Sequence, residues 1–331
     1  MESTPAMAGS VRGGPTMRAA VLRGGGQVEL DEVPVPEPGA GEVRLRLEGC
    51  GVCGSDLPVW AGRDWFTYPR EPGAPGHETW GIVDAVGPGV SGVVEGKRVA
   101  ALSYHGYADY DIGHVGWLVA LGSVLDGRPF PGEALGCAVN VFRRSRISAG
   151  DTVAVVGVGF LGSIVVQLAA RGGARVIGVS RRARSREISL MMGADAAVGL
   201  AGDPVEEVRE LMDGELCDVV VEAAGVQATL DVSGALVRER GRLVVAGFHQ
   251  EGRRTVDMQG WNWRGIDVIN AHERDPAVYV DGIAAAVAAI AEGRLDPEPL
   301  YTHRFGLDDV AKAFAAMSDP SGAAVKALVC P

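Results

Sequence analysis

Long apolar runs are missing from this sequence, cysteines are few, and acidic residues outnumber basic ones. No apolar run is long enough to cross a bilayer, so we expect no membrane association. The 42 acidic and 31 basic residues give a net charge of −11. Surfaces that bind nucleic acid are basic, so a nucleic-acid partner is not expected. A reducing cytoplasm is favoured over a disulfide framework, because the cysteines are scattered and odd in number: Cys50, Cys53, Cys137, Cys217 and Cys330.

The composition that remains is typical of a globular protein with two domains. The chain has 331 residues, of which 47% are apolar and 22% are charged, and this is enough for two sizeable cores. Residues 1–16 are small and rich in glycine and proline, and we expect them to be disordered.

The segment 151–162, DTVAVVGVGFLG, is the stretch around which the chain is organised. A β-branched apolar run leads into three glycines, and the residues that follow have the apolar spacing of a helix. In a dinucleotide-binding turn the first glycine makes the turn, the second lets the backbone approach a pyrophosphate, and the third packs helix on strand. The start of the helix offers free N–H groups to the phosphates. An ordinary glycine-rich turn is the alternative. The predicted cofactor-binding residues are Gly157, Gly159, Phe160, Leu161 and Gly162.

A second predicted strand, 174–180, ends where the adenosine ribose of a dinucleotide should lie, about 20 residues after the motif. An acidic residue at this place favours NAD. This chain has Ser180, Arg181 and Arg182 instead. Guanidinium groups bind phosphate through charge-assisted hydrogen bonds, so we predict NADP(H) rather than NAD(H). The alternative is that these arginines are only the solvated start of the next helix.

Strand and helix patterns divide the chain into two domains. Short alternating strands separated by glycine and proline predict an antiparallel β domain from residue 17 onward. Farther along, strands alternate with helices, which predicts a doubly wound parallel sheet. The last apolar strand, VKALV, is expected to return to the β domain. We therefore assign 17–140 together with 276–331 to the β domain, and 141–275 to the dinucleotide-binding domain.

Two loops of the β domain and one helix start carry side chains that ligate metals. Cys53 lies in the first loop, His77 and Glu78 in the second, and Glu133 near the helix start. Thiolate, imidazole and carboxylate together suit tetrahedral zinc. A catalytic zinc site collects three ligands from separate loops and leaves one position open, whereas structural sites use close CxxC pairs. Cys50 and Cys53 form the only such pair, which disfavours a zinc ribbon; His77 alone would more often be a core histidine.

These motifs together resemble the medium-chain dehydrogenase/reductase family, in its zinc-dependent alcohol and polyol (sorbitol-like) dehydrogenase branch. The segments GVCGSD, GHE, an E-x-L helix entry and GVGFLG occur in the family's order, and the match covers nearly all of the chain from Met17. The resemblance implies an α/β fold with a GroES-like antiparallel β domain and a Rossmann domain. It also implies hydride transfer between a nicotinamide and a small-molecule alcohol or ketone, with zinc as a Lewis acid. Members of the family are homo-oligomers, so a dimer or tetramer is expected.

The same resemblance assigns roles to single residues. Cys53 and His77 fall on the first two zinc ligands. Ser55 falls on the hydroxyl that relays the substrate proton, and Asp56 on the carboxylate that orients the zinc-bound histidine. These four residues, Cys53, Ser55, Asp56 and His77, are the expected catalytic set.

The remaining zinc ligand is open at this stage. Glu133, by its spacing before the glycine motif, resembles the glutamate that polyol dehydrogenases place there. Glu78 resembles a glutamate that ligates zinc directly or exchanges with water in some members. Cys137 is a rival, because it lies one helical turn beyond Glu133 on the same face. We favour Glu133 over Cys137 by spacing.

Two departures from the family pattern refine the prediction. No cysteine lies between Leu102 and Leu135, where many members carry a four-cysteine structural zinc lobe, so we expect one zinc per chain. The second departure is the pair Arg181 and Arg182 in place of an acidic residue. The glutamate-type site and the missing lobe point to a polyol, sugar or cyclitol substrate. A zinc-free quinone or enoyl reductase and a non-enzymatic NADP(H)-binding protein are the alternatives, and the intact zinc-ligand motifs count against both.

Several aromatic residues follow the first cysteine loop, and two interpretations of them are open. They either line the substrate pocket or form a small hydrophobic core under a loop. The residues are Trp60, Trp65, Phe66 and Tyr68.

Overall fold

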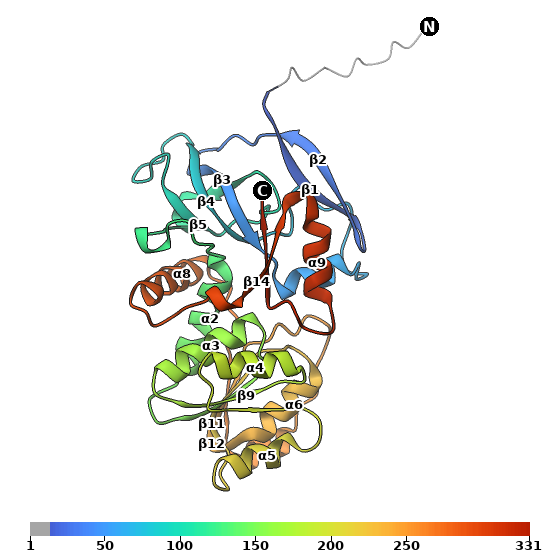
Figure 1. Cartoon of the computed structure of the whole chain (residues 1–331), viewed down its shortest axis with the longest axis vertical. Coiled ribbons are helices and arrows are strands. Elements are labelled where there is room, and N and C mark those ends of the chain that lie inside the picture. The colour runs from blue at the N-terminus through green and yellow to red at the C-terminus, as the bar shows by residue number, and fades with distance from the viewer. Residues whose placement is uncertain (1–13) are drawn as a thin grey trace.

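A computed structural model describes residues 14–331 of the chain. Residues 1–13, which make up most of the segment predicted to be disordered, lie outside this range. At its end the predicted segment 1–16 reaches the first strand: Thr16 pairs with Pro34, and the carbonyl of Pro15 accepts from the N–H of Val35. Two layered domains are visible in Figure 1, a β-rich one in the upper half and an α/β one in the lower half.

The upper domain is built mainly from antiparallel strands, as predicted. A two-stranded ribbon pairs β1 with β2, and a seven-stranded sheet has the order β14-β15-β3-β4-β5-β7, with β6 paired to β3. Its strands from the first part of the chain are β1 (Thr16–Gly24), β2 (Gln27–Pro34), β3 (Glu42–Gly51), β4 (Glu78–Val86), β5 (Arg98–Ala101), β6 (Tyr110–His114) and β7 (Leu118–Ala120). The short helix α1 (Leu57–Trp60) follows β3.

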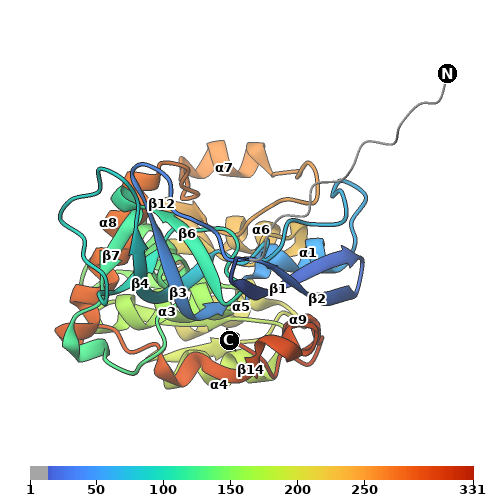
Figure 2. The same ribbon diagram turned by 90° about the horizontal axis from the view of Figure 1, so that it is seen from above.

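The C-terminal segment returns to this domain. Strand β15 (Lys326–Cys330) pairs with β3, with Leu328 opposite Gly51, and β14 (Tyr301–Gly306) extends the sheet beyond it. Helix α9 (Val310–Ser318) contacts β15 and β2, and Figure 2 shows it near β2 and β14. The prediction that the last strand joins the β domain is therefore confirmed.

Most of the aromatic residues after the cysteine loop belong to the core of this domain. The fully buried Phe314 of α9 lies 5.3 Å from the ring of Trp60, stacked, and 5.3 Å from the ring of Tyr107, edge-on. Phe66 and Tyr68 pack against the same cluster. The small-core interpretation holds for these three side chains, whereas Trp65 is 55% exposed.

The lower domain is a six-stranded parallel sheet in the order β10-β9-β8-β11-β12-β13. Its strands are β8 (Thr152–Val156), β9 (Arg175–Val179), β10 (Ala196–Val198), β11 (Cys217–Glu222), β12 (Val237–Val245) and β13 (Asp267–Asn270). The alternating residues of β8 face two cores: Val153 and Val155 pack with α2 and α3, while Ala154 and Val156 pack with α5 and α6. The helices are α3 (Phe160–Arg171), α4 (Ala183–Met191), α5 (Pro204–Leu211), α6 (Gln227–Leu236) and α7 (Met258–Arg264). This is the predicted doubly wound arrangement.

Two helices connect the domains. Helix α2 (Gly132–Ser145) packs along α8 (Pro276–Ala291) and also contacts α3 and β4. Their buried side chains belong to one continuous hydrophobic cluster that includes Trp80 of β4 and Val155 of β8. Within residues 14–331, no helix is long and apolar enough to cross a membrane. The exact domain boundaries assigned from the sequence remain predictions.

Candidate active site

The side chains predicted to bind metal from the two loops converge. Donor atoms of Cys53, His77 and Glu78 all lie within 4.8 Å of one another, the one such group found in the part of the chain that the structure describes. Cys53 follows β3 and is the residue before the 3₁₀ turn η1 (Gly54–Asp56), while Glu78 is the first residue of β4. Because β3 and β4 pair with Gly51 opposite Glu78, the end of one strand and the start of the next bring both loops together.

Hydrogen bonds fix the orientation of the His77 ring. Its Nδ1 lies 2.9 Å from the carbonyl oxygen of Pro75 and 3.3 Å from Oδ1 of Asp56. Both of these atoms are acceptors, so Nδ1 carries the proton and donates. The other nitrogen, Nε2, points toward Glu133, whose Oε2 is 3.9 Å away. Burial lowers the pKa of His77, but the charges of Asp56 and Cys53 outweigh it and hold that pKa well above its usual value. Metal binding would displace the proton from Nε2, and the orientation that Nδ1 fixes would then present Nε2 to the metal.

Asp56 is itself held by two donors. Its carboxylate is almost fully buried and accepts from the hydroxyl of Tyr107 at 2.7 Å and from the backbone N–H of Cys53 at 3.2 Å. These contacts fit the orienting role predicted for Asp56. Sequence reasoning did not identify Tyr107, because no motif surrounds it. Ser55 lies between Cys53 and Asp56 in the same turn and is half-buried.

Helix α2 supplies both of the rival ligands. Glu133 is in its first turn, and Cys137 one turn later donates its thiol to Oε1 of Glu133 at 3.1 Å. Burial raises the pKa of each group, and for Cys137 the neighbouring carboxylate of Glu133 raises it further. Both residues lie at the site, so the choice between them stays a prediction.

Glu78 is engaged by a buried lysine that the sequence analysis did not identify. Both of its carboxylate oxygens accept from Nζ of Lys326, at 2.7 and 2.8 Å, and both side chains are almost completely buried. Lys326 also donates to the carbonyl of Val52 at 3.1 Å and lies 4.5 Å from the ring centre of Phe160. A metal ligated by Glu78 would share its carboxylate oxygens with Lys326. The available signal was a lysine inside the otherwise apolar final strand, VKALV.

The glycine motif has the geometry that a dinucleotide requires. Gly157 has a φ of +99°, and a Cβ there would lie 2.8 Å from Ala224, just after the end of β11. A Cβ at Gly162 would collide with the carbonyl of Gly157, whereas Gly159 faces open space. Helix α3 starts at Phe160 with no side chain capping its first N–H groups. The turn therefore offers free donors and an open approach to a pyrophosphate.

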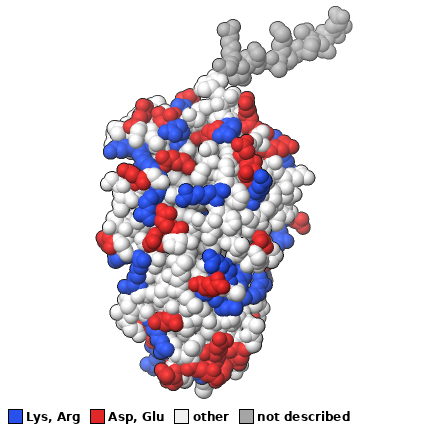
Figure 3. Space-filling model, in the orientation of Figure 1, with Lys and Arg blue, Asp and Glu red and all other residues white. Residues whose placement is uncertain are grey.

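The predicted 2′-phosphate residues lie at the end of β9. Ser180 is buried and donates its N–H to the carbonyl of Val198 at 3.0 Å. Arg181 is exposed, and Arg182 is the residue before helix α4. Figure 3 shows a group of basic side chains on this face of the molecule, over the position that α4 has in Figure 1.

The donor set fits zinc in its chemistry. A thiolate, an imidazole and a buried carboxylate come from separate elements, which is the pattern of a catalytic zinc site with an open position. The described residues between Leu102 and Leu135 include no cysteine, so a four-cysteine structural site in that segment is excluded.

Comparisons with known proteins agree with this two-domain architecture. The family model of the alcohol dehydrogenase GroES-like domain matches residues 39–127, and that of the zinc-binding dehydrogenases matches residues 161–285. Human sorbitol dehydrogenase is 27% identical over 91% of this chain and 92% of its own length. An alcohol dehydrogenase of Cupriavidus necator is 26% identical over 95% of this chain and 99% of its own length. A crystal structure of a Sinorhizobium meliloti protein bound to NADP superposes with a TM-score of 0.84 and 28% identity, covering 96% of this chain and all of the other.

Fold, site and relatives thus define a two-domain dehydrogenase that acts on alcohols. The chain belongs to the medium-chain dehydrogenase/reductase family, in its zinc-dependent alcohol and polyol dehydrogenase branch.

We predict that Asp56→Asn weakens zinc binding about 10- to 100-fold, because His77 then loses the carboxylate that orients its ring. Competition with a chromogenic chelator measures the affinity. Asp109→Asn is the matched control, since Asp109 pairs with Arg18 away from the cluster. Equal zinc affinity of the Asp56→Asn variant and the wild type would contradict the assigned role.

Proposed function

We propose that the chain transfers hydride between NADP(H) and a secondary alcohol or ketone of a polyol, sugar or cyclitol, using one zinc ion per chain. The convergence of Cys53, His77 and Glu133 beside Ser55 carries this proposal. The polyol class is supported by the glutamate at position 133, which we propose as the third ligand, and by the sorbitol dehydrogenases among the relatives. The free cysteines among the described residues support a reducing compartment, which we propose to be the cytoplasm.

The protein's own groups then have distinct tasks. Cys53, His77 and Glu133 would hold the zinc, which when bound supplies a Lewis acid for the substrate oxygen. Asp56 and the Pro75 carbonyl keep the proton of His77 on Nδ1, so that Nε2 stays available as a ligand. Ser55 Oγ would accept the proton of the substrate hydroxyl and pass it toward solvent.

Other groups position the cofactor. The uncapped start of α3 and the open face of Gly159 would receive the pyrophosphate, and the nicotinamide would then extend toward Cys53 and His77. Arg181 and Arg182 would bind the adenosine 2′-phosphate. Lys326 neutralises Glu78, which leaves the charge of the metal to be balanced by Cys53 and Glu133.

Metal analysis and activity of the purified protein test this function together. We expect one zinc per chain, NADPH-dependent reduction of ketoses or inososes, and tighter binding of NADPH than of NADH. Cys53→Ala should lose the zinc and slow turnover about a thousandfold, because about 4 kcal/mol of charge stabilisation is lost. With Glu133 as the third ligand, Glu133→Gln should also lose the zinc and slow turnover, whereas Cys137→Ser should keep both zinc and turnover.

Cys330→Ala is the control for these variants, since Cys330 lies on the last strand and should leave zinc content unchanged. A protein that binds NADPH but contains no zinc after zinc-replete expression would refute the proposal in favour of an enone or quinone reductase, or of a non-enzymatic NADP(H)-binding protein.

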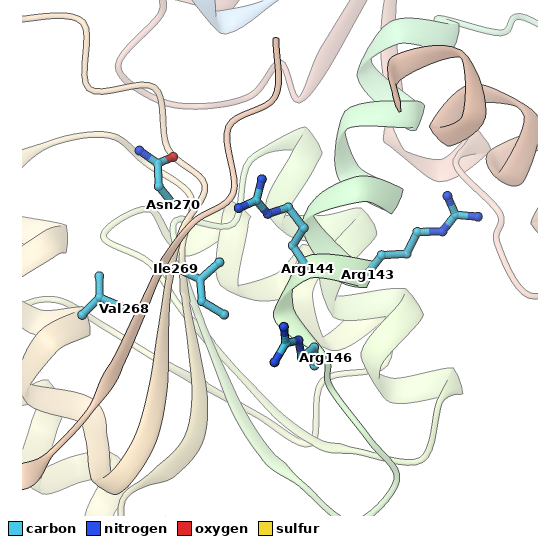
Figure 4. A pocket seen from close by; sticks show the side chains of 6 residues that line it. All are labelled: Arg143, Arg144, Arg146, Val268, Ile269 and Asn270. Atoms are coloured by element: carbon cyan, nitrogen blue, oxygen red, sulfur yellow. The ribbon is translucent and has the colours of Figure 1, made fainter. Parts of the chain in front are cut away.

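We also propose that the protein is a homo-oligomer whose basic unit is a dimer formed through strand β13. This strand pairs only with β12 within the described residues, so its outer edge has unpaired backbone groups. Val268 on this strand is 48% exposed, and Trp263 on the neighbouring helix α7 is 89% exposed. A cavity of about 560 Å³ lies between the edge and the end of α2, lined by three arginines and by Val268, Ile269 and Asn270 (Figure 4). A second copy of the same edge would cover these groups.

Sedimentation velocity tests the dimer. The wild type should sediment at twice the chain mass or a multiple of it, and Val268→Asp should shift it to the monomer, because the new charge would be buried without a partner. Val94→Asp is the matched control, since Val94 is 58% exposed in the other domain. A wild-type protein that is monomeric at micromolar concentration would contradict the proposal.

A further inference from the structure

Arg182 reaches out of its own domain. It follows β9, at the place proposed for the adenosine ribose, yet its side chain lies against the loop between α9 and β15 of the β-rich domain. A Cβ added to Gly322 in this loop would lie 3.0 Å from Nε and 3.2 Å from Nη1 of Arg182, and closer still to its Cδ. Gly322 is buried although the loop around it is exposed. The arginine therefore rests on a surface that exists only because residue 322 has no side chain.

The loop that receives Arg182 is well defined. Asp319 accepts hydrogen bonds from the N–H of Ser321 at 2.9 Å and from its hydroxyl at 2.7 Å. The N–H of Gly322 donates to the carbonyl of Asp319 at 3.1 Å, which closes the turn. The bonds from Ser321 lower the pKa of Asp319, and the positive charge of Arg182 lowers it further. Asp319 is thus a carboxylate close enough to Arg182 for the two charges to attract each other.

Arg182 also differs from the arginines that follow it. Arg184 pairs with Glu187 at 3.1 Å, and Arg186 donates to the carbonyls of Ser180 and Arg181 at 2.9 and 3.0 Å. Arg182 makes no ion pair within 4 Å to any residue in the range 14–331. Its side chain lies against Gly322, and within residues 14–331 its guanidinium donates no hydrogen bond, so its donors are free for a phosphate group.

We propose that the loop 319–322 completes the site for the adenosine 2′-phosphate, with Gly322 and Asp319 as residues that determine cofactor specificity. Gly322 leaves the space in which the Arg182 side chain lies. Asp319 competes with the phosphate for the positive charge of Arg182. The proposal rests on the proposed NADP(H) preference and adds that the second domain contributes to it. A phosphate held there would touch both domains, whereas the ribose of NAD(H) would not need the loop.

Calorimetric titration with 2′,5′-ADP and with AMP isolates this interaction, because the two probes differ in the 2′-phosphate and need neither zinc nor turnover. Arg182→Ala should weaken the binding of 2′,5′-ADP about 10- to 100-fold, which is the loss expected for a charge-assisted hydrogen bond. The affinity for AMP should change about twofold at most. Gly322→Asn should displace Arg182 and weaken 2′,5′-ADP about tenfold, again with little effect on AMP.

Gly293→Asn is the control for backbone strain. Gly293 has the same φ of +70° as Gly322, but nothing lies within 4 Å of its missing Cβ, and asparagine tolerates this conformation. This variant should bind both probes like the wild type. Asp319→Asn tests the loop without filling the space next to Arg182, because asparagine can keep the turn. It should tighten the binding of 2′,5′-ADP about two- to threefold at low salt and leave the affinity for AMP unchanged.

The outcomes separate the two proposals. If the wild type binds 2′,5′-ADP no more tightly than AMP, the NADP(H) preference itself is wrong. If the wild type prefers 2′,5′-ADP but Arg182→Ala leaves the ratio of the two affinities unchanged, the preference stands and the site at Arg182 and its loop is refuted. If Arg182→Ala changes that ratio but Gly322→Asn and Asp319→Asn do not, the preference stands and the role of the loop is refuted. Equal weakening of both probes by Gly322→Asn would also refute it, because that result indicates a structural defect.

Discussion

A buried ion pair between Glu78 and Lys326 connects the separate parts of the site. Glu78 adjoins His77, and Lys326 lies on the last strand of the chain. The same ammonium group binds the carbonyl of Val52, next to Cys53, and lies over the ring of Phe160 at the start of the cofactor-binding helix. Removing one member of a buried pair leaves an uncompensated charge and costs about 3–5 kcal/mol. One pair of charges therefore connects both metal-ligand loops, the C-terminal strand and the glycine turn.

This constraint explains how distant parts of the sequence form one site. Strands β3 and β4 bring Cys53 and His77 together, and α2 adds Glu133 from the other side while packing on α8 and α3. The hydrophobic cluster that includes α2 is continuous between the domains, so the metal site and the nucleotide sheet share a core. Catalysis of hydride transfer needs that rigidity, because the reacting atoms must meet at near-contact distance.

The sequence was most informative where local chemistry determines the structure. Gly157 and Gly162 of the motif each have a separate steric reason in the fold, Gly159 leaves the approach to the turn open, and the alternation of strands and helices identified the parallel sheet. The loops that carry Cys53 and His77 were found from residue type and spacing. Contacts made across long sequence distances were not found: Lys326 meets Glu78 only because the last strand returns to β3, and Tyr107 meets Asp56 through tertiary packing. Nor could spacing show that Trp60 packs on Phe314 rather than lining a pocket.

A double-mutant cycle between Glu78→Gln and Lys326→Met, read by unfolding free energy and zinc content, tests whether these two charges stabilise the protein as a pair. Each single change should destabilise the protein strongly, the double variant should lose less than the sum of the two by about 2–3 kcal/mol, and Glu78→Gln should still bind one zinc. Additive losses would show that the two charges do not stabilise the protein as a pair. A Glu78→Gln variant of normal stability that no longer binds zinc would show that Glu78 ligates the metal instead.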